Sequence, residues 1–318
     1  MKVSVLMITY NHERYVAQAV ASALEQQTRF DFEIVIGDDC STDATRAILI
    51  DLQRRHPDRI RLLLRDANIG MHHNLVQTLK ACGGEYVALL EGDDYWTSPQ
   101  KLQTQAEFLD RHPECAISFH GATVRYEDGS REPRTHPSGR QKPISTLADL
   151  IDRNFMPNCS VMFRNRLIDE FPPWFYTLKM ADWSLHILNA QHGHIGYIDE
   201  VMSVYRIHPS GAWSAQKPTW ALHETIRALH ALNRHLDFKY NRRVQTALST
   251  CYYKLAYYHA HEGDRVQAQS YLLRSIAAQP LNKAIVLGQI VLALKLYAPR
   301  LYQPLRAAGR YLFRRSPG

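Results

Sequence analysis

Hydrophobic and polar positions form alternating blocks along the first hundred residues. Short apolar runs of the kind found in buried strands cover residues 3–9, 32–37, 60–64 and 86–91. Between the first two runs, apolar residues at positions 16, 19, 20, 23 and 24 fall on one helix face, and Asn11 is a candidate cap for that helix. Strands and helices alternating at this spacing predict an α/β fold, with a mostly parallel sheet flanked by helices.

The middle of the chain has a less regular pattern. Asp128 and Gly129 predict the turn of a hairpin, and the Pro- and charge-rich residues 134–143 predict an exposed loop. A helix is expected to begin near residue 180. Residues 193–214 are expected to form a pair of strands that leads into a polar loop.

After Pro218 the pattern becomes almost wholly helical. Residues 253–280 resemble a tetratricopeptide-type helix pair with Gly263 at its turn. We therefore predict two regions, an α/β domain over residues 1–217 and a helical C-terminal region over residues 218–318.

Polar clusters follow three of the predicted strands, at residues 9–11, 37–43 and 91–94. In a parallel sheet the carboxyl ends of the strands meet at one edge, and ligands bind in the crevice beyond that edge. We therefore expect the three clusters to converge on one site.

The segment LLEGDDYW, residues 89–96, places three carboxylates within four positions. Carboxylates this close repel and raise one another's pKa. Divalent cations such as Mg²⁺ and Mn²⁺ prefer carboxylate oxygens and share them with phosphate oxygens, so Asp93 and Asp94 are candidate metal ligands. The alternative is a solvated acidic loop or a helix cap, because acidic pairs are common on protein surfaces.

Three further positions have a functional and a structural interpretation. Asp38 and Asp39 end the second strand, where a carboxylate can accept hydrogen bonds from a base or a ribose or can cap the next helix. Asp182 stands at a predicted helix start and is either a general base or a cap. His208 is either a metal or phosphate contact or an ordinary loop residue, and with 16 histidines in the chain the ordinary role is the more common one.

Composition narrows the class of protein. With 318 residues, 45% of them hydrophobic, the chain can bury a sizeable core, which excludes wholesale disorder. The five cysteines lack metal-binding spacing and indicate reduced thiols in a cytosol. The N-terminal residues lack a signal-peptide pattern, and no apolar stretch reaches the ~18 residues of a membrane span. The absence of GxSxG, GxxxxGKS/T, GxGxxG and HExxH argues against the enzyme classes that carry these motifs.

The net charge of +7 is unevenly distributed. Residues 265–318 contain nine Lys and Arg and no Asp or Glu. Within residues 282–318 the basic positions are interleaved with Leu, Tyr and Phe, and Pro299 and Pro304 divide the segment into two short helices. Such a segment can lie on an anionic membrane surface. The alternative is a helical cap packed on the α/β domain or on a second subunit.

Several sequence blocks follow one another in a specific order. They are VSVLMITYNHERYVAQAVASALEQQ, FEIVIGDDCSTDAT, NIGMHHNLVQTLKACGGEYVALLEGDDYW, ADWSLHILNA and GYIDEVMSVYRIHPSGAWS. This order resembles family 2 glycosyltransferases of the GT-A fold over about residues 1–215. The resemblance implies a Rossmann-like, nucleotide-sugar-binding sheet, and it does not extend to the helical region.

The resemblance implies which residues hold the nucleotide. The family's aromatic residue after the first strand and acid after the second strand match Tyr10 and Asp39. Thr9 and Asp38 are their neighbours. The NIG sequence, which begins with Asn68, matches a segment that borders the nucleotide pocket.

The resemblance also implies a metal site and a catalytic base. Asp93 and Asp94 match the family's metal-binding acids, with Asp94 as the direct ligand, and Asp93 also borders the nucleotide. Asp182 matches the catalytic base. Arg206 and His208 match a late loop that closes over the diphosphate, with His208 also a candidate metal ligand.

The chain departs from the family pattern at two positions. It has Glu91-Gly-Asp-Asp in place of a strict Asp-x-Asp, so either Glu91 stands at the first carboxylate position or Asp93 alone suffices. The acid that precedes the catalytic base in the family is replaced by Ala181.

The implied activity is inverting, metal-dependent sugar transfer. The cofactor is Mn²⁺ or Mg²⁺, the donor a nucleotide-diphospho-sugar with UDP as the first choice, and the acceptor a glycan or a lipid-linked hydroxyl in surface polysaccharide, lipopolysaccharide or glycoconjugate synthesis. The expected location is the cytoplasm or the cytoplasmic membrane face, without a nucleic-acid partner. The alternatives are a nucleotidyltransferase, which releases pyrophosphate, and a non-catalytic nucleotide-sugar-binding protein.

Overall fold

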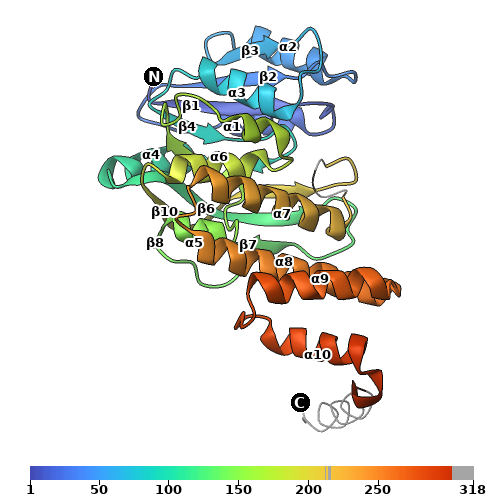
Figure 1. Cartoon of the computed structure of the whole chain (residues 1–318). Helices are drawn as coiled ribbons and strands as arrows, with labels where there is room; N and C mark the ends of the chain where they lie inside the picture. Colours follow the sequence, from blue (N-terminus) through green and yellow to red (C-terminus); the bar gives the residue numbers. More distant parts are fainter. Residues whose placement is uncertain (212, 214–215, 303–318) are drawn as a thin grey trace, which may run out of the picture. The chain divides into compact units, whose positions relative to one another are not determined.

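The centre of the fold is the strand pair β1 (Val3–Thr9) and β2 (Phe32–Asp38) of a ten-stranded mixed sheet. The computed structural model describes residues 1–211, 213 and 216–302. These residues belong to two compact units, Met1–Ala215 and Gln216–Gly318, and Figure 1 labels their elements.

The other strands of the sheet are β3 (Ile60–Leu64), β4 (Tyr86–Leu89), β5 (Tyr95–Trp96), β6 (Cys115–Tyr126), β7 (Arg134–His136), β8 (Ile144–Ser145), β9 (Met162–Arg164) and β10 (His194–Ile207). The helices of the first unit are α1 (Val16–Leu24), α2 (Thr45–Arg55), α3 (Met71–Ala81), α4 (Lys101–Arg111), α5 (Leu147–Asp152) and α6 (Ala181–Ala190), with 3₁₀ turns η1 (Asn158–Ser160) and η2 (Pro173–Thr177).

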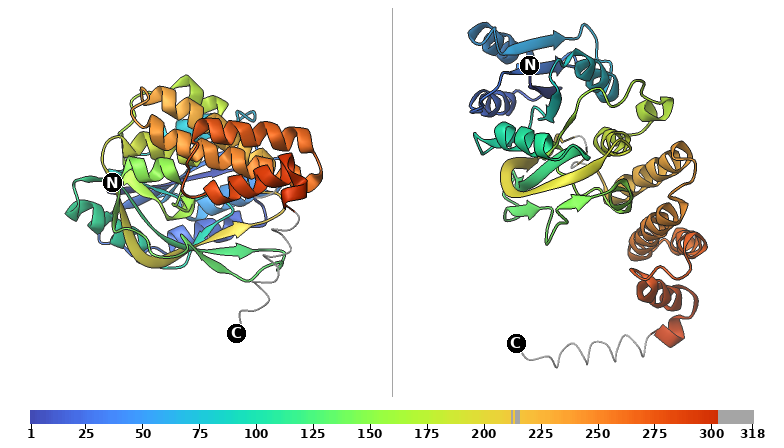
Figure 2. Two further views of the ribbon diagram at one scale, coloured as in Figure 1. Left: turned by 60° about the horizontal axis from the view of Figure 1, so that its bottom comes forward. Right: turned by 90° about the vertical axis from the view of Figure 1, so that its left-hand side faces the viewer.

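The strand order is β3-β2-β1-β4-β9-β6-β10-β5, with β7 paired to β6 and β8 to β10. Strands β3, β2, β1 and β4 are mutually parallel, whereas β9 runs antiparallel to both of its neighbours. Helices α1 and α4 cover one face of the sheet, and α3 and α6 cover the other (Figure 2). The predicted α/β fold with helices on both faces is therefore confirmed.

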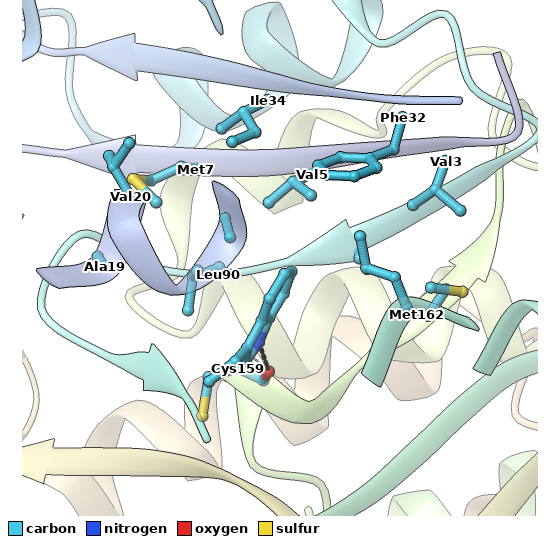
Figure 3. Close-up of a cluster of buried hydrophobic side chains, with 14 of the residues drawn as sticks. Val3, Val5, Met7, Ala19, Val20, Phe32, Ile34, Leu90, Cys159 and Met162 are labelled. Atoms are coloured by element: carbon cyan, nitrogen blue, oxygen red, sulfur yellow. Dashed lines mark hydrogen bonds between the residues drawn. The ribbon is translucent and has the colours of Figure 1, made fainter. Parts of the chain in front are cut away.

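The central strands are apolar because both of their faces are buried. Val3, Val5 and Met7 of β1 belong to a buried cluster that also contains Val20 of α1 and Ile34 of β2 (Figure 3). The opposite face packs against α3 so closely that a Cβ added at Gly37 would lie 2.1 Å from Thr78 Oγ1. This two-sided burial explains why the strands could be located from the sequence alone.

Register brings the polar strand ends together. Thr9 of β1 lies opposite Asp38 of β2. Beyond β4 the chain continues beside β1, with Gly92 N donating to Ile8 O at 3.2 Å. The segments after β1, β2 and β4 therefore end at one edge of the sheet, as predicted.

Three local predictions were wrong. Asn11 does not cap α1, which begins after Tyr15; its side chain instead accepts a hydrogen bond from Thr42 N at 2.8 Å. Residues 193–214 contain one long strand, β10, rather than two, because it pairs with β6 along most of its length through several register shifts. The predicted exposed loop over 134–143 begins with β7, which completes the expected hairpin with β6.

The second unit is helical, as predicted after Pro218. Its helices are α7 (Pro218–His235), α8 (Asn241–Glu262), α9 (Arg265–Ala278) and α10 (Val286–Tyr297). Helix α8 packs against α7 and α9, and α10 packs against α9 (Figure 2). The helix pair predicted over residues 253–280 corresponds to α8 and α9, joined at Gly263 in a left-handed conformation (φ 85°).

The predictions for residues 282–318 are tested only in part. Helix α10 ends at Tyr297, before Pro299, as the predicted break requires. Pro304 and the rest of residues 303–318 lie outside the described residues. Over the part of the chain that is described, every helix is too short or too polar to cross a bilayer.

Lys101 is a buried amine in the first turn of α4. Its Nζ lies 4.0 Å from the centre of the Trp96 ring and makes no hydrogen bond within the described residues. Burial holds the pKa of Lys101 well below its usual 10.5. The folded unit therefore binds this proton less tightly than the unfolded chain does, and its stability rises with pH up to about 10.5.

We expect Lys101→Met to raise the free energy of unfolding by roughly 1–3 kcal/mol at pH 7, because Met fills similar space without a buried polar atom. The gain should shrink between pH 7 and pH 10. Urea denaturation of both proteins across this range measures the difference. A gain that is constant with pH would contradict the assignment.

Candidate active site

Three carboxylates form a cluster in the turn between β4 and β5. Oxygen atoms of Glu91, Asp93 and Asp94 lie within 4.8 Å of one another. The turn is tightly packed beside β1, since a Cβ added at Gly92 would lie 2.8 Å from both Thr9 Oγ1 and His12 Nδ1. Glycine at position 92 thus lets the acids approach the end of β1.

The cluster has the chemistry of a divalent cation site. Asp94 Oδ1 accepts a hydrogen bond from Arg206 N at 2.8 Å, whereas its buried Oδ2 makes none within the described residues. Burial and the charges of Asp93 and Asp182 raise the pKa of Glu91 to about 8. Burial and the neighbouring acids also raise the pKa of Asp94 well above its usual value. An all-oxygen donor set with an unpartnered carboxylate oxygen fits Mg²⁺ or Mn²⁺.

His208 lies beside the cluster rather than within it. Its Nε2 is 3.0 Å from Asp93 Oδ2 and its Nδ1 is 2.9 Å from Ser210 Oγ. His12 approaches the same Asp93 oxygen at 3.8 Å. Burial opposes ionisation of Asp93, but the hydrogen bond from His208 and the charge of His12 lower its pKa. In this structure His208 therefore orients a candidate metal ligand.

Arg206 is buried against the acidic turn. Its side chain is only 4% exposed and lies over the rings of Tyr15 and Tyr95, at 5.1 and 4.4 Å from their centres. The guanidinium donates to Asp93 O and to Gln18 Oε1. Arg206 thus holds the acidic turn in place.

The two acids at the end of β2 have separate roles. Asp38 is fully buried and accepts hydrogen bonds from Ser41 N and Arg46 Nε, both at 3.2 Å, which is a structural arrangement. Asp39 instead accepts from the backbone N–H groups of Ile69 and Gly70, at 2.8 and 2.9 Å.

The other residues predicted to bind the nucleotide lie next to the contact between Asp39 and the 69–70 backbone. Asn68 Oδ1 accepts from Gly70 N at 3.1 Å, so the side chains of Asn68 and Asp39 share one N–H group. At the end of β1, the ring of Tyr10 is 43% exposed, and the buried Thr9 Oγ1 makes no hydrogen bond within the described residues. Tyr10, Asp39 and Asn68 are therefore brought to the same edge of the sheet.

Asp182 lies in the first turn of α6. It is not the helix cap, because Met180 occupies that position. Asn154 Nδ2 donates to Asp182 Oδ2 at 3.3 Å, and burial raises the pKa of the Asp182 carboxyl. The charge of Asp182 raises the pKa of Glu91, so Asp182 lies near the acidic cluster.

Two residues near the acids were missed in the sequence. His12 comes directly after the polar cluster at residues 9–11, and that proximity was the available signal. Burial and the charges of Asp94, Glu91, Asp93 and Asp182 raise the pKa of Tyr205 well above its usual value. Its position beside the acids depends on the pairing of β10, which the local sequence does not reveal.

Comparison with known proteins agrees with this architecture. Residues 4–171 match the family model "Glycosyl transferase family 2". The chain is 42% identical over 211 residues to the uncharacterized protein Rv1520 of Mycobacterium tuberculosis, covering 66% of this chain and 60% of that protein. It is 30% identical over 247 residues to the putative teichuronic acid biosynthesis glycosyltransferase TuaG of Bacillus subtilis, covering 72% and 89%. The chain therefore belongs to glycosyl transferase family 2.

Solved structures share the fold at low sequence identity. Staphylococcus aureus TarS 1–349 in complex with UDP-GlcNAc superposes with a TM-score of 0.56 at 20% identity, covering 88% of this chain and 92% of that one. The mannosyltransferase PcManGT from Pyrobaculum calidifontis, in complex with GDP-Man and Mn²⁺, superposes with a TM-score of 0.56 at 17% identity, covering 99% and 88%.

The two hydrogen bonds from the 69–70 backbone to Asp39 lead to a specific prediction. Asp39→Asn replaces one acceptor oxygen by a donor, so one of the two backbone hydrogen bonds is lost. That hydrogen bond, worth about 1.5–3 kcal/mol to a charged group, holds the 68–70 segment at the predicted nucleotide site, so its loss should lower UDP affinity by up to about a hundredfold, as measured by calorimetry. Asp51→Asn on the exposed face of α2 is the control and should bind UDP normally. Unchanged affinity in Asp39→Asn would remove Asp39 from the nucleotide site.

Proposed function

We propose that this chain is a metal-dependent, inverting glycosyltransferase that moves a sugar from a nucleotide-diphospho-sugar to an acceptor hydroxyl. The observation that carries the proposal is the three-carboxylate cluster at the carboxyl edge of the parallel strands, with the partly buried Asp182 beside it. Membership of glycosyl transferase family 2 supports it.

The donor binds across the ends of β1 and β2. Tyr10 packs on the base, Asp39 and Asn68 form its polar edge, and Thr9 and Asp93 border the diphosphate. A UDP-sugar is the first choice, because TarS, a relative in fold, binds UDP-GlcNAc. PcManGT binds GDP-Man, so the identity of the base is decided by experiment.

Glu91, Asp93 and Asp94 would hold Mn²⁺ or Mg²⁺. When bound, the cation neutralises charge on the diphosphate and thereby assists its departure. His208 and Arg206 act on the site from outside, since they fix Asp93 and the turn that carries all three acids.

Asp182 acts as the general base. Its carboxylate takes the proton of the acceptor hydroxyl while the acceptor oxygen bonds to the anomeric carbon from the face opposite the diphosphate. The bond from that carbon to the diphosphate oxygen breaks, and the nucleoside diphosphate leaves with the electron pair. This single displacement inverts the anomeric configuration. The raised pKa of Asp182 makes it a stronger base than an exposed carboxylate.

The acceptor is a hydroxyl of a glycan or a lipid-linked sugar in bacterial surface polysaccharide synthesis. TuaG, which is named for teichuronic acid biosynthesis, supports this class. The chain spans 60% of the length of its mycobacterial relative, so the acceptor of the whole protein is part of the proposal. The corresponding location is the cytoplasm or the cytoplasmic face of the membrane.

A nucleotide-sugar panel tests the proposal. Thermal stabilisation by one donor identifies the ligand, because binding raises apparent stability by mass action. Product analysis with Mn²⁺, Mg²⁺ or EDTA then identifies the reaction. Metal-dependent release of nucleoside diphosphate supports a glycosyltransferase, release of pyrophosphate indicates a nucleotidyltransferase, and binding without turnover on any acceptor indicates a binding protein.

A further inference from the structure

Helix α10 has two apolar faces, and residues within the described part of the chain pack against only one of them. Leu292 and Leu296 are buried in a small core with Ala256, Ala268 and Leu272 of α8 and α9. On the other side the large apolar residues are exposed: Leu287 by 72%, Ile290 by 52%, Val291 by 43% and Tyr297 by 50%. Their spacing places them along one side of the helix. We call these four residues the α10 outer face.

An exposed apolar stripe of this kind marks an interaction surface. The stripe is separate from the residues that pack α10 onto its own unit, because those buried residues lie on the opposite side of the helix. The apolar side chains continue beyond the helix ends, with Leu281 75% exposed and Leu301 63% exposed.

Charge indicates the kind of partner. Lys283, Lys295 and Arg300 lie on or next to α10, and the sequence contains no Asp or Glu after Asp264. A second copy of this chain would bring two basic surfaces together, which is unfavourable. An anionic lipid surface offers both apolar depth and negative charge.

We propose that the α10 outer face lies in the headgroup region of an anionic bilayer. The helix has 12 residues and is about 18 Å long, against about 30 Å for a bilayer core. It therefore lies along the membrane instead of crossing it. The bound chain then meets acceptors that are themselves anchored in the bilayer, and this second step rests on the proposed glycosyltransferase function.

Liposome flotation of the full chain tests the proposal. The protein should float with vesicles of equal parts phosphatidylglycerol and phosphatidylcholine and should remain unbound with phosphatidylcholine alone. Ile290→Glu should lower the floated fraction about tenfold, since it places a charge in the apolar contact. Val201→Glu is the matched control, because Val201 is a β-branched residue with 46% exposure in β10, and it should float like the wild type.

Three results would overturn the proposal: no flotation of the wild type, wild-type flotation of Ile290→Glu, or a dimer in sedimentation that Ile290→Glu dissociates without any vesicle binding. Calorimetry of donor binding without vesicles separates the two proposals. Donor binding without flotation would contradict only the proposed membrane binding by the α10 outer face. Flotation without donor binding would contradict only the proposed glycosyltransferase function.

Discussion

Asp182→Asn should lower turnover by about two to four orders of magnitude, the usual contribution of a general base. The amide cannot accept the acceptor's proton, although it occupies the same space at the start of α6. Donor affinity should change little, because the carboxylate serves the acceptor side of the reaction. Steady-state transfer assays and calorimetry with the donor measure the two quantities separately.

The matched control for this variant is Asp169→Asn, which alters an exposed acid 13 positions earlier in the chain. It should transfer sugar at the wild-type rate. If Asp182→Asn instead lost donor binding while remaining folded, Asp182 would belong to the nucleotide site and another group would be the base.

Asp94→Asn should abolish most metal-dependent donor binding while the fold is retained. A neutral amide is a poor ligand for a hard divalent cation, and its nitrogen would carry hydrogens into a cluster of acceptors. The hydrogen bond from Arg206 N can persist to the amide oxygen, so the turn should keep its shape. Electron paramagnetic resonance of Mn²⁺ measures metal binding directly, without reliance on turnover.

Asp58→Asn provides the comparison, since Asp58 is an exposed acid between α2 and β3. It should bind Mn²⁺ as the wild type does. Mn²⁺ affinity that is equal in Asp94→Asn and the wild type would place the metal elsewhere, and the cluster would then be a structural feature of the turn.

The local sequence was sufficient to predict the positions of strands β1 to β4 and of most helices. Strands β1, β2 and β4 are largely buried on both faces, so each appears as a mainly apolar run that ends in polar residues. The sequence blocks that resemble the family also located the acidic turn, which directly follows β4, and Asp182, which lies in the first turn of α6. Long β10 was misjudged since its polar residues suggested a turn where the structure has register shifts.

The roles of individual side chains depended on contacts between distant segments. Asp39 is satisfied by backbone N–H groups 30 and 31 positions away, which no local pattern indicates. Arg206 matches a family loop that closes over the diphosphate, and the pairing of β10 with β5 places its guanidinium over the rings of Tyr15 and Tyr95.

The sequence by itself therefore determined the α/β fold and the edge of the sheet at which the polar strand ends meet, because periodicity and strand ends are local properties. Only the tertiary structure decided that His208 orients Asp93 and that Arg206 supports the acidic turn. It also decided that α10 has an apolar face left exposed. Burial and hydrogen-bond partners arise from packing between segments far apart in the chain, so they are not contained in any short stretch of it.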